Sequence, residues 1–339
     1  MKLDFRSDTV TKPTPEMREA MATAVVGDDV FGDDPTVNEL ERYGAELLGH
    51  EAALFCASGT QTNQIAINVW TQPGDEVICH EEAHIYRYEG GGMALNSFVS
   101  ARFLRGNSGR INPLEIVPNI NPDDQHYPRT SLVSIEDTAN RGGGICYNFD
   151  QIKQIAEISL ANQLPLHLDG ARVFNALQEN GVDFKEYGRQ FDSISICLSK
   201  GLGAPVGSLL LGNKDFIKKA RRVRKRMGGG MRQAGIIAAG GLYALQHHID
   251  RLGEDHRRAK EVQHILEKKS WIQEVIPVQT NIVVGHLTAG LSEFEVVDKI
   301  AEMGILCVPF GKGRIRFTTH LDIDDRSIEQ LNEKLPDVI

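Results

Sequence analysis

The chain has 339 residues, of which 41% are hydrophobic and 24% charged, and its formal net charge at pH 7 is -9. This composition is close to the average for globular proteins and excludes a fibrous or wholly disordered chain, while the acidic balance argues against general nucleic-acid binding. No run of 18 or more apolar residues occurs and the first ten residues lack an apolar signal core, so we expect a cytoplasmic protein without a membrane span.

Two helices are predicted in the first 50 residues. Thr14 and Pro15 are typical of a helix start, and we expect Gly27 to end that helix. Asp34 begins a second helix, which has an apolar stripe and ends at Gly49.

Short apolar strands then alternate with helices up to about residue 250, and Asp150 is expected to cap one of these helices. This alternation predicts a mainly parallel sheet covered by helices on both faces. Ligands bind such sheets beyond the carboxyl ends of the strands. The predicted strands cover 52–56, 76–79, 131–135, 164–168, 193–198 and 208–211.

The pattern changes after about residue 252, which predicts a large domain over 1–252 and a smaller α+β domain over 253–339. The expected elements of the smaller domain are a helix over 254–270, strands over 280–285, 305–308 and 314–319, a helix begun by a capping box of Ser292 and Glu295, and a last helix.

Five cysteines are present, and no two of them form a CxxC motif. An odd number of scattered cysteines argues against a disulfide framework or a structural zinc ribbon, so we expect reduced thiols. The cysteines are Cys56, Cys79, Cys146, Cys197 and Cys307.

Two strand ends carry residues suited to ligand binding. Ser58, Gly59 and Thr60 lie where a strand meets a helix, and free amides at a helix start bind anions. An ordinary capped helix explains this segment about as often. Asp169 terminates another strand, where its carboxylate could bind a metal, a ribose or a protonated ring nitrogen, or could simply cap a helix.

Two further features follow strands. Lys200 comes after an apolar strand and before a glycine-rich turn, where a lysine can lose its proton and form a Schiff base; a surface lysine is the alternative. The aromatic-rich segment 84–88, which contains His84 and Tyr86, offers rings that could stack on a flat cofactor. A phosphate seat, a carboxylate, a lysine and a ring together predict pyridoxal 5'-phosphate (PLP) as the cofactor.

Two other motifs resemble a zinc site and a nucleic-acid site, but each has a simpler structural explanation. His80 and His84 match the HExxH pattern of zinc hydrolases, but we expect His80 to lie at the end of a strand rather than within a helix. The basic run over 218–226 predicts a helix with a solvated basic face rather than a nucleic-acid site.

With these features, the chain resembles the low-specificity L-threonine aldolases, which are PLP-dependent enzymes of the aspartate-aminotransferase superfamily (fold type I). The resemblance covers nearly the whole chain. It rests on FRSDTVTKPTPEM, VGDDVFGDDPTVNELE, ASGTQTNQIA, HIYRYEGGGMA, HLDGARVFNA, LSKGLGAPVGS, GGGMRQAGIIAA and RFTTHLD, in that order. It implies a PLP-dependent transferase-like large domain with a mainly parallel seven-stranded sheet, followed by the smaller α+β domain.

The resemblance also implies roles for the cofactor site. Lys200 would be the PLP lysine, Asp169 would pair with the pyridine nitrogen, and His84 would stack on the ring. Ser58, Gly59 and Thr60 would hold the phosphate.

By the same resemblance, Arg172 would lie near the ring hydroxyl and the substrate carboxylate, which Ser7 and Arg316 would also bind. Strand alternation places Arg314 and Arg316 on the same face, so spacing cannot choose between them. The family's R-x-x-T-H pattern favours Arg316, with Arg314 as the fallback. Tyr86 would shape the substrate pocket.

One segment departs from the family. Where the family commonly has Glu-Asn-Thr-His, this chain has Glu136, Asp137, Thr138 and Ala139. The roles of the missing amide and histidine therefore cannot be transferred.

The resulting hypothesis is retro-aldol cleavage of L-threonine or L-allo-threonine to glycine and an aldehyde, with His84 or His126 as the base. Another PLP-dependent β-eliminating lyase or an aminotransferase is the alternative. Small amino acids are the expected partners, without nucleic acid or membrane. The resemblance implies a homo-oligomer, for which we expect a tetramer, with Lys225 and Arg232 reaching a neighbour's active site.

Overall fold

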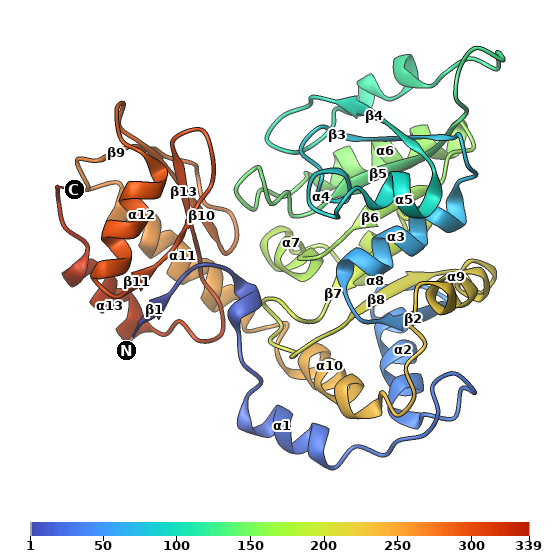
Figure 1. The fold of residues 1–339 in the computed structure, drawn as a ribbon, viewed down its shortest axis with the longest axis horizontal. Helices are drawn as coiled ribbons and strands as arrows, with labels where there is room; N and C mark the ends of the chain where they lie inside the picture. Colours follow the sequence, from blue (N-terminus) through green and yellow to red (C-terminus); the bar gives the residue numbers. More distant parts are fainter. Residues whose placement is uncertain (1, 339) are drawn as a thin grey trace.

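The computed structural model describes residues 2–338, which form a large sheet and a smaller sheet, each packed against helices (Figure 1). The elements up to residue 247 are β1 (Leu3–Asp4), α1 (Pro15–Ala22), α2 (Pro35–Leu47), β2 (Ala52–Cys56), α3 (Gly59–Trp70), β3 (Glu76–His80), α4 (His84–Arg87), α5 (Gly92–Ser97), β4 (Ser100–Leu104), β5 (Thr130–Glu136), α6 (Phe149–Ala161), β6 (Leu166–Asp169), α7 (Val173–Asn180), α8 (Phe184–Gly188), β7 (Ser193–Cys197), β8 (Ser208–Gly212), α9 (Lys214–Arg226) and α10 (Gly235–His247).

The elements that follow are α11 (Leu252–Leu266), β9 (Ile272–Val275), β10 (Ile282–Leu287), α12 (Glu293–Glu302), β11 (Ile305–Leu306), β12 (Val308–Pro309), β13 (Arg314–Thr318) and α13 (Asp325–Lys334). Short 3-10 helices lie at Asp8–Val10, Pro113–Glu115 and Val117–Asn119.

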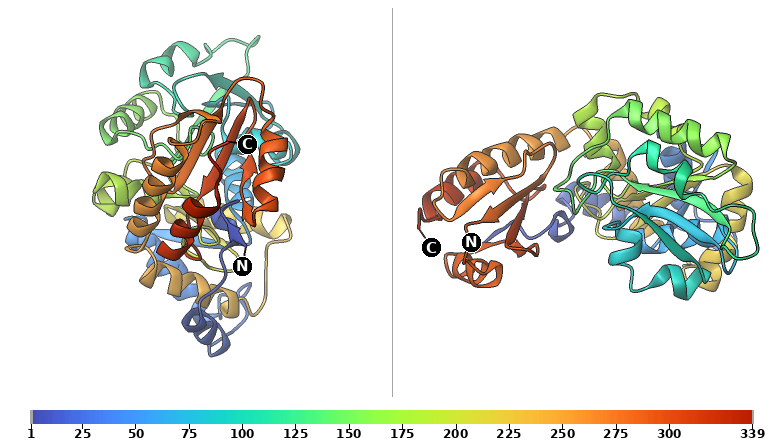
Figure 2. Two further views of the ribbon diagram at one scale, coloured as in Figure 1. Left: turned by 90° about the vertical axis from the view of Figure 1, so that its left-hand side faces the viewer. Right: turned by 90° about the horizontal axis from the view of Figure 1, so that it is seen from above.

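The large sheet has seven strands in the order β2-β8-β7-β6-β5-β3-β4. Strand β8 runs antiparallel to both of its neighbours, and the remaining pairs are parallel. Alternate residues of β8 face opposite helical layers: Leu209 and Leu211 join the core with α2, α6 and α7, whereas Leu210 packs with α3 and α9. This arrangement confirms the predicted mainly parallel sheet with helices on both faces (Figure 2).

The small sheet is antiparallel, with strand order β12-β13-β10-β9, and has its own apolar core with α11, α12 and α13. The N-terminal strand packs on the same core, where β1 pairs in parallel with β11 as a separate two-stranded sheet. Helix α1 instead packs on α10, beside the large sheet. The N-terminal segment therefore runs from one sheet to the other, and the division at residue 252 stays a prediction.

Several helix starts agree with the sequence. The side chains of Thr14 and Asp34 cap α1 and α2, as predicted. Helix α1, however, ends at Ala22 rather than Gly27, where the β-branched pair Val25 and Val26 disfavours a further turn.

Other boundaries were wrong in ways that involve capping or long-range pairing. Asn148, not Asp150, caps α6, because its side chain accepts the Asp150 amide. Ser292 stands at the start of α12, but its side chain makes no capping hydrogen bond. The expected strand over 305–308 is two strands, because β11 pairs with β1 while β12 pairs with β13.

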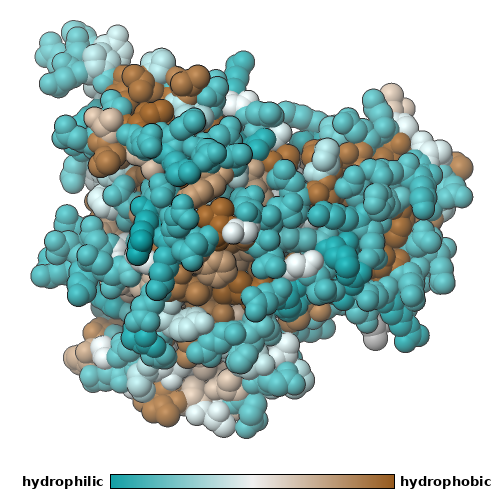
Figure 3. All heavy atoms as spheres, turned by 180° about the vertical axis from the view of Figure 1, so that it is seen from behind, coloured by the Kyte–Doolittle hydropathy of each residue, from teal (hydrophilic) through white to brown (hydrophobic). Residues whose placement is uncertain are grey.

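All five cysteines are buried and free of disulfides. Within residues 2–338, no helix is both long and apolar enough to cross a membrane. The face opposite to that of Figure 1 is mostly hydrophilic and is interrupted by apolar patches (Figure 3).

Candidate active site

Part of the predicted site is gathered at the carboxyl ends of the central strands. Asp169 is the last residue of β6, and Lys200 lies three residues beyond β7, its parallel neighbour. A cavity of about 160 Å³ opens at this edge. Six predicted residues line it, namely Ser7, His84, Asp169, Arg172, Lys200 and Arg316. Its other lining residues are Thr9, Glu136, Thr138, Asn140 and Ala171.

The Asp169 carboxylate is buried and held by hydrogen bonds. The Asn63 amide on α3 donates to one oxygen at 3.0 Å, and the Ala171 amide donates to the other at 3.3 Å. Asn63 in turn contacts the ring of His167 at 3.1 Å. Burial lowers the pKa of His167 to about 4, so this ring is neutral at pH 7 and supports the carboxylate without adding charge.

The position of His84 depends on two carboxylates that the sequence reasoning missed. The His84 amide donates to Glu136 at 2.9 Å, and its ring Nδ1 lies 3.1 Å from Glu89. Burial opposes protonation of the ring, but the bond to Glu89 and the nearby charge of Asp169 outweigh it and raise the pKa of His84. Glu89 is itself buried and also accepts from Asn63 at 2.9 Å. In the sequence, the available signal for Glu89 was its place as a single acidic residue between the aromatic-rich segment 84–88 and a Gly-Gly-Gly run.

A buried ion pair fixes Arg172. Its guanidinium donates to both oxygens of Asp8, at 2.7 and 2.6 Å, and Asn281 donates to the same carboxylate at 3.2 Å. Burial alone would raise the pKa of Asp8, but Arg172 holds it well below its usual range. Asp8 was missed because its partner is 164 residues away in sequence.

The structure places Arg316, and not Arg314, against the cavity. Ile315 and Phe317 are fully buried on the opposite face of β13, as strand alternation predicted. Arg316 donates to the side-chain oxygen of Asn140 and to the carbonyl of Arg6, both at 3.0 Å. Burial, followed by repulsion from other guanidiniums, lowers the pKa of Arg316 to about 10.

The segment from Ser58 to Thr60 forms the first turn of α3. Ser58 caps the helix by accepting the Gln61 amide at 3.2 Å. In the described part of the chain, no protein acceptor faces the amides of Gly59 and Thr60, which leaves both donors available. A Cβ atom on Gly59 would lie 2.6 Å from the Cys197 sulfur, so the end of β7 packs tightly beneath this turn.

Besides the segment from Ser58 to Thr60, four predicted residues do not line the cavity. The exposed ring of His126 lies 2.7 Å from Asp124, and Tyr86 packs edge-on against Phe103. Lys225 is exposed on α9, and Arg232 pairs with Asp28 at 2.9 Å. Their roles stay predictions.

In the segment that differs from the family pattern, 136–139, the side chain of Asp137 points into the protein core. This carboxyl accepts from the Tyr187 hydroxyl at 2.6 Å and from the Tyr147 amide at 3.2 Å. Burial raises the pKa of Asp137 to about 7. Ala139 is also buried, so neither changed residue projects a polar group into the cavity.

The HExxH pattern has no metalloprotease geometry. His80 ends β3 and His84 begins α4, so the two histidines are not one turn apart on a helix, as the sequence led us to expect.

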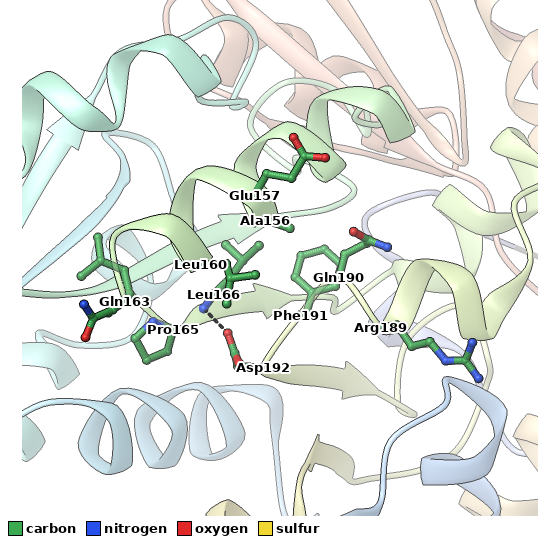
Figure 4. Close-up of a pocket in the computed structure, with 11 residues that line it drawn as sticks. Ala156, Glu157, Leu160, Gln163, Pro165, Leu166, Arg189, Gln190, Phe191 and Asp192 are labelled. Atoms are coloured by element: carbon green, nitrogen blue, oxygen red, sulfur yellow. Dashed lines mark hydrogen bonds between the residues drawn. The ribbon is translucent and has the colours of Figure 1, made fainter.

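A larger cavity of about 420 Å³ lies at the opposite edge of the sheet, before β6 and β7 (Figure 4). Its Asp192 carboxylate already accepts the Leu166 amide at 2.8 Å. None of the predicted site residues lines this cavity, so its size does not make it the better candidate.

Comparisons with known proteins agree with this geometry. The family model described as Beta-eliminating lyase matches residues 4–289. The low specificity L-threonine aldolase of Escherichia coli K12 is 43% identical over 336 residues, which span 98% of this chain and 96% of that protein. A probable low-specificity L-threonine aldolase 2 of Arabidopsis thaliana is 40% identical over 96% of this chain and 94% of its own length.

Solved structures share the fold at lower identity. A threonine aldolase of Leishmania major superposes with a TM-score of 0.83 at 22% identity and 98% coverage of both chains. A putative L-allo-threonine aldolase of Listeria monocytogenes EGD-E gives a TM-score of 0.81 at 21% identity, over 98% of this chain and 95% of that one. Given the sequence identities and the family match, this chain belongs to the low-specificity L-threonine aldolases, a family of lyases.

Proposed function

We propose that the protein uses PLP to cleave L-threonine, L-allo-threonine and other β-hydroxy-α-amino acids into glycine and an aldehyde. The names of its relatives support the reaction class. The observation that carries the proposal is the meeting of Lys200, Asp169 and Arg316 in one cavity, because these groups supply an amine, a carboxylate and a binder for the substrate carboxylate.

The residues fit the proposed cofactor chemically. Lys200 offers the amine that would bond to its aldehyde carbon, and the Asp169 carboxylate suits a protonated ring nitrogen. The free amides of Gly59 and Thr60 suit a phosphate at the start of α3. When bound, PLP supplies an electron sink for the pair released at Cα.

The chain's own residues would then orient the amino acid. Arg316 has a buried Nε without a partner among residues 2–338, and the Ser7 hydroxyl lines the same cavity. Both are suited to bind the α-carboxylate, with Arg172 beside them. His84 has one ring nitrogen engaged by Glu89, which leaves its Nε2 to accept the proton of the β-hydroxyl as the Cα–Cβ bond breaks.

His126 remains the second candidate for the base. Its loop is exposed and lies outside the cavity of this chain, so His84 has the better geometric support. Separate His84→Asn and His126→Asn variants distinguish the two. The base variant should lose kcat for threonine and flatten the acid limb of the pH profile.

We also propose a homotetramer with shared active sites. The segment 25–31 exposes apolar side chains, with Val25 at 68% and Phe31 at 76% exposure, and Arg232 pairs with Asp28 within it. This exposure supports an interface between copies. Lys225 and Arg232 are expected to reach the neighbour's site, which sedimentation and subunit-mixing of inactive variants would test.

The central experiment is a Lys200→Ala variant with Lys153→Ala as its control, because Lys153 lies on the exposed surface of α6. We expect Lys200→Ala to lose both threonine cleavage and the visible absorption of bound cofactor, while Lys153→Ala keeps both. Retention of both signals in Lys200→Ala would refute the assignment of Lys200.

Product analysis decides the reaction itself. The match to a β-eliminating lyase family favours β-elimination as the second candidate. Glycine and acetaldehyde in equal amounts are expected from threonine, whereas a keto acid in place of glycine would favour the elimination or transamination alternative.

A further inference from the structure

Three arginines surround the ring of Phe310 beside the candidate active site. The guanidinium carbons of Arg141, Arg314 and Arg316 lie 3.9, 5.3 and 5.2 Å from the ring centroid. We call these residues the arginine cluster. Arg316 lines the active-site cavity, and Arg141 directly follows Asn140, which also lines it. The cluster therefore borders the place where the substrate is expected to bind.

Neutral oxygens hold all three guanidiniums in place. Arg141 donates to the carbonyl of Phe310 at 2.8 Å, and Arg314 donates to the carbonyl of Gly311 at 3.0 Å. Arg316 is held by an amide oxygen and a carbonyl. Such contacts fix the orientation of the cations without neutralising their charge.

The cluster has little anionic compensation. Within residues 2–338, the one carboxylate within 4.0 Å of any of the three guanidiniums is Glu82, at 3.7 Å from Arg141. The Nε atoms of Arg141 and Arg316 are buried and have no hydrogen-bond partner in this part of the chain. Burial, and then repulsion by Arg141, lowers the pKa of Arg314. Three fixed cations beside one carboxylate are the arrangement expected of an anion site.

One α-carboxylate can engage Arg316, but it leaves Arg314 without an anion and Arg141 with only Glu82 at 3.7 Å. We propose that these two arginines form a second anion subsite, which selects β-hydroxy-α-amino acids with a carboxylate or phosphate on the side chain. This inference rests on the proposed aldolase function and narrows its substrate class.

The chemistry of such a substrate needs no additional reactant. In β-hydroxyaspartate, the β-hydroxyl gives up its proton to the base and its oxygen becomes the carbonyl of glyoxylate. The Cα–Cβ bond breaks, its electron pair stays with Cα, and protonation of Cα gives glycine. No group is oxidised or reduced overall by the protein.

The test compares three substrates by the glycine that each releases: L-threonine, L-β-hydroxyaspartate, and a threonine analogue with a phosphate ester on its γ-carbon. We expect kcat/KM for at least one acidic substrate to exceed that for threonine tenfold or more, and the preferred one identifies the anion. R141Q and R314Q should each reduce the ratio of kcat/KM for the preferred acidic substrate to kcat/KM for threonine at least fivefold, mainly through KM. The double variant should lose the preference for the acidic substrate.

A matched control and a binding measurement complete the test. K312Q removes an exposed charge from the same hairpin and should leave the ratio unchanged. L-Aspartate has no β-hydroxyl to cleave, so its stabilisation of the protein in thermal melts, relative to L-alanine, reports binding without turnover. This difference should disappear in the double variant.

Each outcome separates the two proposals. Cleavage of threonine without a preference for either acidic substrate would overturn the anion subsite and leave the aldolase function standing. An equal fractional loss of kcat/KM for all three substrates in R141Q and R314Q would also overturn the anion subsite. No glycine from any substrate would refute the aldolase function itself.

Discussion

The substitution Asp8→Asn tests the buried ion pair that holds Arg172. The Asp8 side chain is fully buried, and that of Arg172 is 6% exposed. Asparagine keeps the shape of the side chain, but it removes the charge and replaces one accepting oxygen with an NH2 group. That group would face a guanidinium or the Asn281 amide, both of which are donors.

The expected loss of stability is large because the remaining charge stays buried. Removing one partner of a buried pair typically costs about 3–5 kcal/mol, against roughly 1 kcal/mol or less for an exposed pair. Since Arg172 keeps the pKa of Asp8 below its usual value of about 4, the pair stabilises the fold above that pH. The difference between wild type and Asp8→Asn should therefore be full at pH 7 and shrink as the pH falls below about 4.

Urea unfolding at pH 7 measures this difference. Trp70 lies beside the large sheet and Trp271 in the small-sheet core, so tryptophan fluorescence reports on both. The control is Asp150→Asn, whose carboxylate pairs with Lys153 on the exposed surface and should change little. An Asp8→Asn variant that unfolds within about 1 kcal/mol of the wild type would refute the reasoning.

Three further predictions concern pH and packing. Burial raises the pKa of Asp137 to about 7, so the folded state keeps a proton that the unfolded chain releases between about pH 4 and 7, and stability falls as the pH rises through this range; Asp137→Asn should flatten that fall in melting temperatures. Burial lowers the pKa of His84, but the hydrogen bond to Glu89 helps to raise it above its usual value. Glu89→Gln should therefore shift the acid limb of the kcat profile to lower pH, and an unshifted limb would count against His84 as the base. Gly59→Ala brings a Cβ to 2.6 Å from the Cys197 sulfur and should weaken PLP binding about tenfold, or roughly 1.4 kcal/mol, in a fluorescence titration; unchanged affinity would place the phosphate elsewhere.

The sequence predicted the large sheet well because its signals are local. Asp169 and Lys200 each follow a short apolar strand and precede glycine, and parallel neighbours bring such strand ends to one edge. The choice of Arg316 over Arg314 needed the family pattern, since both have the same spacing. The structure agrees in placing Arg316 at the cavity.

The features that were missed depend on contacts between distant parts of the chain. Asp8 has no local pattern that points to its bond with Arg172. The strand expected over 305–308 divides because the N-terminal residues pair with its first half, which no local propensity reveals. The role of Glu89 depends on its hydrogen bonds to Asn63 and His84, which belong to separate helices.

The crossing of the N-terminal segment has a mechanical consequence. Strand β1 pairs with β11 and packs in the core of the small sheet, yet four residues later Asp8 binds Arg172 at the edge of the large sheet. A hinge motion between the two sheets would have to stretch or rupture this tether. An amino acid bound by Arg316 on β13 and by the groups at the carboxyl ends of β6 and β7 would add a second contact between the two sheets, so substrate binding would restrict the same motion.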